Sequence, residues 1–136
     1  MAPRSSPRPS RPLKLFDSDV LIEYLRDNPS AADLLVPAVR AEEAACSVLA
    51  RFELLAGMRS AERHATHSLL DAMTNLPVTD NVASRAGEMA RSYRRSHAHI
   101  SAVDYLIAAT AEQEGADLLT LNVRHFPMFD DLEPAF

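Results

Sequence analysis

Residues 13–25 read Leu-Lys-Leu-Phe-Asp-Ser-Asp-Val-Leu-Ile-Glu-Tyr-Leu, a short apolar run that ends in a carboxylate and continues as an amphipathic segment. The first four residues are apolar enough for a buried strand, and the apolar residues after them recur at helical spacing. Asp17 therefore stands where a parallel strand passes into a helix, and open α/β sheets form their ligand crevices at such strand ends. The alternative is that Asp17 or Ser18 simply caps the helix.

Length and composition predict one soluble globular domain. The chain has 136 residues, of which 47% are hydrophobic and 24% charged. Residues 1–12 hold four prolines and three arginines without an apolar pattern, which predicts a disordered tail before a single domain over 13–136. No apolar run approaches the length of a membrane span, and the first residues lack the apolar core of a secretory signal. We therefore expect a cytoplasmic protein that does not contact membranes.

The net charge of −5 is unevenly distributed. Without the three arginines of the tail, 11 of the 14 basic residues remain against 19 acidic ones, a balance of −8. That sign does not suit a protein that holds nucleic acid mainly by neutralising phosphates. It suits carboxylates that need cations, or a basic partner, although ordinary solubilising charge is the simpler interpretation.

Further apolar runs predict the other strands of the sheet. They lie at residues 44–49 and 117–121, and residues 76–79 are a weaker candidate. These strands alternate with segments of helical composition, which predicts a mainly parallel sheet with helices on both faces. The predicted fold class is thus a three-layer α/β/α sandwich.

The helices between these strands show start and stop signals. Asn28-Pro29 is a typical helix start, and Pro37 should kink or divide the helix that follows. Residues 50–58 are helical in composition. Ala65, Leu69, Met73 and Leu76 recur at helical steps. Asp80 is the predicted cap of the next helix, and the last runs from Ser101 to a stop at Gly115.

Four polar residues occupy comparable places in this pattern. Asp17 ends the first strand, Glu53 lies one turn into the helix after the second, Asp104 lies in the first turn of the Ser101 helix, and Asn122 follows the last strand. In a parallel sheet such positions can meet at one edge. Three carboxylates and an amide would form an oxygen-lined site suited to Mg²⁺ or Mn²⁺, and such ions support phosphodiester hydrolysis.

Each of these residues also has a structural interpretation. Ser101 and Asp104 are spaced as a capping box, with Asp in place of the usual Glu. Glu53 could be a solvated helix residue, although Phe52 and Leu54 flank it. Asn122 could simply terminate a strand. Spacing alone does not decide between the two interpretations.

Residues 14–128 resemble a PIN domain, and specifically the VapC-type toxins of bacterial toxin–antitoxin pairs. Four segments carry the resemblance, in the family's order and approximate spacing: Leu-Phe-Asp-Ser-Asp-Val-Leu-Ile-Glu-Tyr-Leu at 15–25, Ser-Val-Leu-Ala-Arg-Phe-Glu-Leu-Leu-Ala-Gly at 47–57, Ile-Ser-Ala-Val-Asp-Tyr-Leu-Ile-Ala-Ala-Thr at 100–110 and Leu-Leu-Thr-Leu-Asn-Val-Arg-His-Phe at 118–126. The resemblance implies a Mg²⁺-dependent endoribonuclease toxin, with Mn²⁺ able to substitute, that leaves 5′-phosphate and 3′-hydroxyl ends.

The resemblance also implies roles for the residues. Asp17 and Asp104 would bind the ion, and Glu53 would ligate it or orient the attacking water. Asp19 falls where the family often has Asn or Ser, so we treat it as an accessory residue. The family's fourth acidic position falls at or beside Asn122, which would hold a water on the ion or a phosphate oxygen. Because an amide binds a hard cation more weakly than a carboxylate, this departure argues against a second permanently bound ion.

The resemblance further implies partners: an RNA substrate, a cognate VapB-type antitoxin that lies in an apolar groove near the site, and a second copy of the chain in a homodimer. The only basic cluster in residues 13–136 consists of Arg91, Arg94 and Arg95 with His97 and His99. It could grip RNA phosphates near the site, although a solvated helix face explains it equally well. The candidate RNA-binding residues are Arg91, Arg94, Arg95 and Arg124. The aromatic residues are few, and none of them suggests a base-stacking platform.

Two alternative functions are open. One is a PIN nuclease that acts in RNA maturation or on structured DNA, without a toxin role. The other is a catalytically inactive PIN-like binding module, for which Asn122 in place of an acidic residue is the best argument.

Overall fold

The computed structural model describes residues 12–136, so the tail predicted to be disordered lies, apart from Pro12, outside the described residues. Four strands form one parallel sheet in the order β3-β2-β1-β4. Their bounds are β1 (Lys14–Phe16), β2 (Ala44–Ser47), β3 (Thr74–Leu76) and β4 (Asp117–Leu119). The first strand therefore pairs directly with the last: Phe16 is in register with Leu119. The predicted parallel sheet is confirmed.

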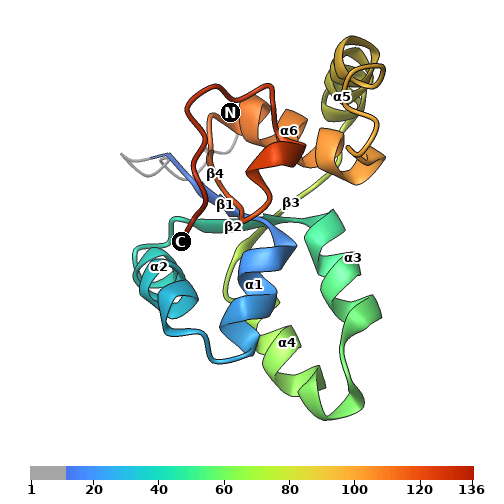
Figure 1. The fold of residues 1–136 in the computed structure, drawn as a ribbon. Coiled ribbons are helices and arrows are strands. Elements are labelled where there is room, and N and C mark those ends of the chain that lie inside the picture. The colour runs from blue at the N-terminus through green and yellow to red at the C-terminus, as the bar shows by residue number, and fades with distance from the viewer. Residues whose placement is uncertain (1–11) are drawn as a thin grey trace, which may run out of the picture.

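Helices cover both faces of this sheet (Figure 1). Their bounds are α1 (Ser18–Leu25), α2 (Pro29–Arg40), α3 (Val48–Gly57), α4 (Arg63–Asp71), α5 (Asp80–Tyr93) and α6 (Ala102–Glu114). There are also two short 3₁₀ turns: η1 (Ser60–Glu62) lies between α3 and α4, and η2 (Val123–His125) follows β4. The first four helices lie below the sheet in Figure 1, and α5 and α6 lie above it.

The core is divided in two because successive strand residues point to opposite faces. Phe16 and Cys46 pack with α1 to α4, whereas Leu15 and Ala45 pack with α5 and α6. All four side chains are fully buried. The predicted three-layer sandwich is confirmed.

All four predicted strands differ in their bounds. The first begins at Lys14 rather than at Leu13, and the strand predicted at 117–121 ends at Leu119. The strand at 44–49 ends at Ser47, whose hydroxyl accepts a hydrogen bond from Leu49 N at 3.1 Å and so caps α3. Apolar residues alone cannot show this change, because Val48 and Leu49 fit a strand as well as a helix. The weak strand at 76–79 is also displaced: β3 begins at Thr74 and ends at Leu76.

The helices differ from their predictions in three places. The helix predicted from Ala65 to Leu76 ends at Asp71, before β3. Thr79, not Asp80, caps α5, since its hydroxyl accepts from Val82 N at 3.1 Å. Pro37 lies inside α2 without dividing it. No helix in the described part of the chain is long and apolar enough to cross a membrane.

Candidate active site

Asp17 lies at the carboxyl end of the central strand β1 and is almost buried, at 8% exposure. Its backbone N–H donates to Leu119 O at 2.9 Å, which fastens it to β4. Its Oδ1 accepts from Ser18 N and its Oδ2 from the Thr120 hydroxyl, both at 2.9 Å. Asp17 therefore caps α1, as the alternative interpretation of this residue predicted. It also faces the end of β4.

Burial raises the pKa of Asp17 to about 6, and the nearby charge of Asp19 adds to the increase. The hydrogen bond from Thr120 acts in the opposite direction, because it stabilises the ionised form. The charge of Asp104 also contributes to the increase. A buried carboxylate that is surrounded by other carboxylates is poised to take up either a proton or a cation.

Asp19 connects α1 to the segment after β4. Its Oδ1 accepts from Val20 N at 2.7 Å, and its Oδ2 accepts from Leu121 N at 3.0 Å and the Thr120 hydroxyl at 3.3 Å. Burial raises its pKa as well. Asp19 and Asp17 thus share the fully buried hydroxyl of Thr120. Sequence reasoning missed Thr120, for which the only signal was a threonine inside an apolar strand end.

Asp104 lies in the first turn of α6, and both interpretations of its motif apply. It forms the predicted capping box with Ser101, whose N–H donates to Asp104 Oδ2 at 3.0 Å. The same oxygen lies 3.2 Å from His125 Nδ1 in η2. These contacts all use Oδ2, so Oδ1 can serve as a ligand.

Glu53 lies on the exposed side of α3 and still interacts with the other carboxylates. Partial desolvation raises its pKa, the charges of Asp104 and Asp19 raise it further, and the side chain of Ser18 opposes the increase. Charge interactions therefore link Asp104 both to Asp17 and to Glu53, although the three residues come from separate segments.

Asn122 reaches this edge less directly. Its N–H donates to Thr120 Oγ1 at 3.1 Å, so it is linked to Asp17 through Thr120. Its side chain is exposed and lines a cavity of about 440 Å³ together with His99, Arg124 and His125.

The oxygen donors of this cluster fit a hard divalent cation, since Mg²⁺ and Mn²⁺ prefer carboxylate and carbonyl ligands. Burial is the main cause of the raised pKa of Asp17 and of Glu53, and the repulsion between carboxylates that adds to it is the interaction that a cation would relieve. As the side chains stand, residues 12–136 contain no three Asp, Glu, His or Cys side chains grouped closely enough to hold an ion. Ion binding at the carboxylates therefore requires that side chains of this cluster change position.

The basic cluster lies at the end of α5 and beyond it. Arg91, Arg94 and Arg95 are all exposed, and so is Arg124. The ring nitrogen His99 Nε2 lies 3.0 Å from Arg124 O, which holds the segment after α5 against η2. The four candidate RNA-binding arginines are thus distributed over two adjoining segments. Their role in RNA binding stays a prediction.

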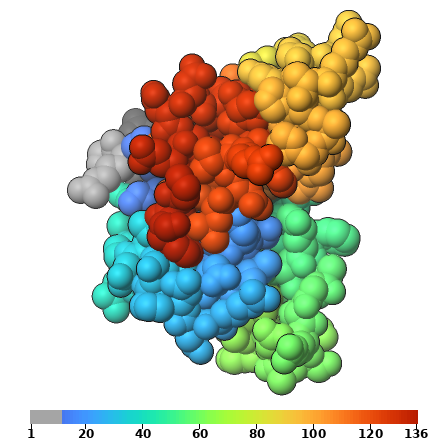
Figure 2. All heavy atoms as spheres, in the orientation of Figure 1, coloured from blue at the N-terminus to red at the C-terminus, as the bar shows by residue number. Residues whose placement is uncertain are grey.

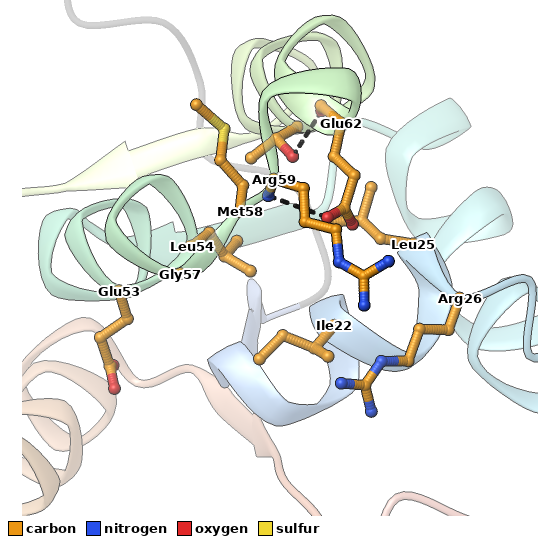
Figure 3. Close-up of a pocket in the computed structure, with 10 residues that line it drawn as sticks. Ile22, Leu25, Arg26, Glu53, Leu54, Gly57, Met58, Arg59 and Glu62 are labelled. Carbon is orange, nitrogen blue, oxygen red and sulfur yellow. Dashed lines mark hydrogen bonds between the residues drawn. The ribbon is translucent and has the colours of Figure 1, made fainter.

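A second cationic feature was not predicted from the sequence. A pocket of about 380 Å³ lies between α1, α3 and η1, and Glu53 lines it together with Arg26 and Arg59. Figure 3 shows the two guanidinium groups near one another, with Glu53 at the other end of the pocket. The arginines are 33 positions apart in the chain, so no sequence pattern could have placed them together.

Comparison with known proteins agrees with this architecture. The PIN domain family model matches residues 14–131. The chain therefore belongs to the PIN domain family.

Within that family the chain is similar to VapC proteins. It is 50% identical over 125 residues to Ribonuclease VapC19 of Mycobacterium tuberculosis, an alignment that covers 91% of this chain and 100% of that protein. It is 51% identical over 122 residues to Ribonuclease VapC10 of the same organism. This alignment covers 90% of this chain and 92% of that protein. The resemblance to VapC-type proteins is thereby confirmed.

Solved structures share the fold. A DNA-bound VapBC complex from Salmonella typhimurium matches with a TM-score of 0.78 at 17% identity, over 93% of this chain and 100% of that chain. A toxin–antitoxin complex from Klebsiella pneumoniae matches with a TM-score of 0.72 at 21% identity, over 90% of this chain and 98% of that chain.

Proposed function

We propose that the protein is the toxin of a VapB–VapC type pair, an endoribonuclease that hydrolyses RNA phosphodiester bonds with the help of Mg²⁺ or Mn²⁺. The ribonuclease names of its half-identical relatives support this proposal. The observation that carries it is the junction of β1 and β4, where Thr120 links the buried Asp17 to Asp19 beside Asp104 and Glu53.

Asp17 and Asp104 are the residues that we propose as direct ligands of the ion, with Glu53 as a third. When bound, the ion would supply charge neutralisation at the phosphate and an activated water. Glu53 is the exposed member of the group, so it can also accept a proton from the attacking water. Asn122 can donate to a phosphate oxygen through its amide.

The negative charge of the site must be compensated before the phosphate of a substrate can bind there. Four carboxylates repel a phosphate unless a cation or basic side chains compensate for them. Exposed arginines border the site on two sides: Arg124 beside Asn122, and Arg26 with Arg59 in the pocket next to Glu53. We propose that these side chains hold the RNA backbone while the carboxylates hold the ion.

For the antitoxin we propose a groove of about 520 Å³ between α1, α2 and α4. Its walls are mostly apolar, and Leu35, Val39, Ala65 and Leu69 contribute to them. An amphipathic helix with basic residues would suit both this groove and the acidic body.

Phe52, which is 70% exposed, is a separate apolar surface that we assign to a homodimer contact. Cytoplasmic location stays a prediction.

The decisive experiment is cleavage of total cellular RNA by purified protein that is free of any partner, with Mn²⁺, with Mg²⁺ and with EDTA. An Asp17→Asn/Asp104→Asn variant is compared with an Asp33→Asn/Asp130→Asn variant, which removes two exposed carboxylates outside the site. Discrete cuts that need the ion and disappear only in the first variant support the proposal.

Two results would contradict it. Well-folded protein that neither cleaves RNA nor binds Mn²⁺ would indicate an inactive binding module. Cleavage of branched DNA in preference to RNA, without growth arrest on expression, would indicate a PIN nuclease with another role.

A further inference from the structure

We propose that four aromatic rings, those of Tyr93, His97, His99 and His125, form a stacking surface for an RNA base beside the carboxylates. We call these rings the histidine row. This inference rests on the proposed nuclease function and adds a binding subsite to it. Neither the family resemblance nor the comparisons assign one there, and the scarcity of aromatic residues had argued against such a surface.

The row is continuous. The Tyr93 and His97 ring centroids are 5.6 Å apart, those of His97 and His99 are 5.9 Å apart, and those of His99 and His125 are 5.4 Å apart. Neighbouring planes are inclined by 53° to 73°, so no ring is stacked face to face on the next. The rings come from the end of α5, the loop after it and η2, which lie against each other (Figure 2).

Each imidazole is held through one of its nitrogens. His97 Nδ1 lies 2.8 Å from Ser96 Oγ, His99 Nε2 lies 3.0 Å from Arg124 O, and His125 Nδ1 lies 3.2 Å from Asp104 Oδ2. These contacts fix the orientation of each ring. A ring whose orientation is fixed before binding loses little conformational freedom when a base stacks on it.

The surroundings suit a nucleotide. His99 is exposed, and with His125, Asn122 and Arg124 it lines the cavity of about 440 Å³. Single-stranded RNA is recognised mainly by stacking its bases on aromatic side chains, including histidine, and by contacts to its phosphates. The ring faces supply the first kind of contact, and the exposed guanidinium of Arg124 supplies the second.

A metal site is the other role that several histidines could have. Within residues 12–136, as the side chains stand, no three His, Asp, Glu or Cys side chains are grouped closely enough to hold an ion, which applies to the row with Asp104 as it does to the carboxylates. One nitrogen of each imidazole is already engaged by another group, namely Ser96 Oγ, Arg124 O or Asp104 Oδ2.

The position of the histidine row relative to Asp104 determines which nucleotide along the RNA would stack on it. It ends at His125, in contact with Asp104, a proposed ion ligand. A base on His99 therefore belongs to a nucleotide next to the scissile phosphate, so the row would contribute to the choice of cleavage position.

The first test observes the imidazole protons by NMR in EDTA, while adenosine 5′-monophosphate or ribose 5-phosphate is added at constant pH. Stacking predicts upfield shifts of the His97, His99 and His125 signals with the nucleotide and not with the base-free sugar phosphate. The chain's other two histidines, His64 and His67 on α4, are internal controls that should not shift. Equal responses to both compounds, or none to either, would overturn the proposal.

The second test separates the ring of His99 from its nitrogen. His99→Phe keeps a ring without the contact to Arg124 O, whereas His99→Gln keeps a donor without a ring. Loss of stacking should raise KM for a short RNA about tenfold in His99→Gln, with kcat unchanged. His99→Phe keeps the ring but not the contact that orients it, so its KM should rise clearly less. The same pair of changes at His67 is the matched control.

The outcomes distinguish this inference from the proposed function. If His99→Phe is as impaired as His99→Gln, the nitrogen contact matters and the stacking surface is overturned. If the parent cleaves RNA but both His99 variants equal it, the subsite is overturned while the nuclease function stands. If the nucleotide shifts appear but the parent cleaves no RNA, the subsite stands and the nuclease function falls.

Discussion

The hydroxyl of Thr120 donates a hydrogen bond to Asp17 Oδ2 over 2.9 Å, and it joins two buried residues that are 103 positions apart in the chain. The same hydroxyl lies 3.3 Å from Asp19 Oδ2 and accepts from Asn122 N. One small side chain thus connects two carboxylates of the candidate site with Asn122, the residue at or beside the family's fourth acidic position. The electrostatics of the site depend on this contact, because Thr120 stabilises the ionised form of Asp17.

Thr120→Val should therefore move the acid limb of the activity profile to higher pH. The substitution keeps the shape of the side chain but removes the donor, so the pKa of Asp17 should rise above its value of about 6. The loss of a hydrogen bond to a charged group also predicts a stability loss of about 2 kcal/mol at neutral pH. The measurements are RNA cleavage from pH 5 to 9 and urea unfolding.

Thr110→Val is the control for that variant, because Thr110 is equally buried but donates to Leu106 O within its own helix. It should lose stability without moving the pH profile. An unchanged profile in Thr120→Val would show that Thr120 does not control Asp17.

Asp17→Asn should stabilise the protein in EDTA at neutral pH although it abolishes cleavage. The folded-state pKa of Asp17 is raised from 3.8 to about 6, so the protonated carboxyl favours folding. This contribution is fully present below pH 4 and is lost as the pH rises through 6. Two pKa units correspond to about 3 kcal/mol, which the neutral amide would recover. Thermal unfolding at several pH values should show a gain that grows between pH 4 and 7. Asp33→Asn, on the exposed side of α2, should show none.

Mn²⁺ should bind more tightly as the pH rises from about 5 to 7. Asp17 must lose its proton before it can ligate, and its pKa of about 6 lies inside that range. Calorimetry in buffers of different ionisation enthalpy should detect proton release at pH 5.5 and much less at pH 7.5. The same affinity at both pH values would exclude Asp17 as a ligand.

The same substitution should have opposite effects at two glycines. Gly115 ends α6 with φ of +61°, where a side chain is strained, so Gly115→Ala should cost about 1 kcal/mol. Gly87 lies inside α5 with no atom within 4 Å of an added Cβ, so Gly87→Ala should stabilise by about 0.5–1 kcal/mol. Urea unfolding of both variants tests the pair, and equal signs would contradict it.

Ala65→Arg should separate inhibition from catalysis. Ala65 is exposed on α4 in the apolar groove proposed for the antitoxin, away from the carboxylates. The long charged side chain should weaken antitoxin binding at least about 100-fold, since it places an unpaired charge in an apolar contact. RNA cleavage should persist and should resist added antitoxin. Full inhibition of the variant would place the antitoxin elsewhere.

The sequence was sufficient for the order of the elements and for the positions of the carboxylates. Asp17 and Asp104 could be found because each follows a recognisable local signal, a strand end and a capping box. Element boundaries were less predictable. Val48 and Leu49 fit a strand by composition, and only the hydrogen bond from Leu49 N to the Ser47 hydroxyl shows that the helix has begun.

Contacts between distant segments could not be read from local patterns. Thr120 looks like an ordinary strand residue until its hydroxyl is seen against Asp17. The histidine row was visible only as His97-x-His99, since His125 joins it through the packing of η2. Arg26 and Arg59 share a pocket because α1 and α3 lie side by side, which hydrophobic periodicity does not encode.

The pairing of the first strand with the last has a consequence during synthesis. Asp17 can accept the hydrogen bond of Thr120, and can donate its backbone N–H to Leu119 O, only when β4 has joined the sheet. The C-terminal segment then fastens this strand end, since Ala135 N donates to Thr120 O at 2.9 Å. A ribosome-bound chain that still holds residues 117–135 in the exit tunnel therefore carries its acidic residues unassembled. A nascent chain can thus complete this site only after residues 117–135 have left the exit tunnel.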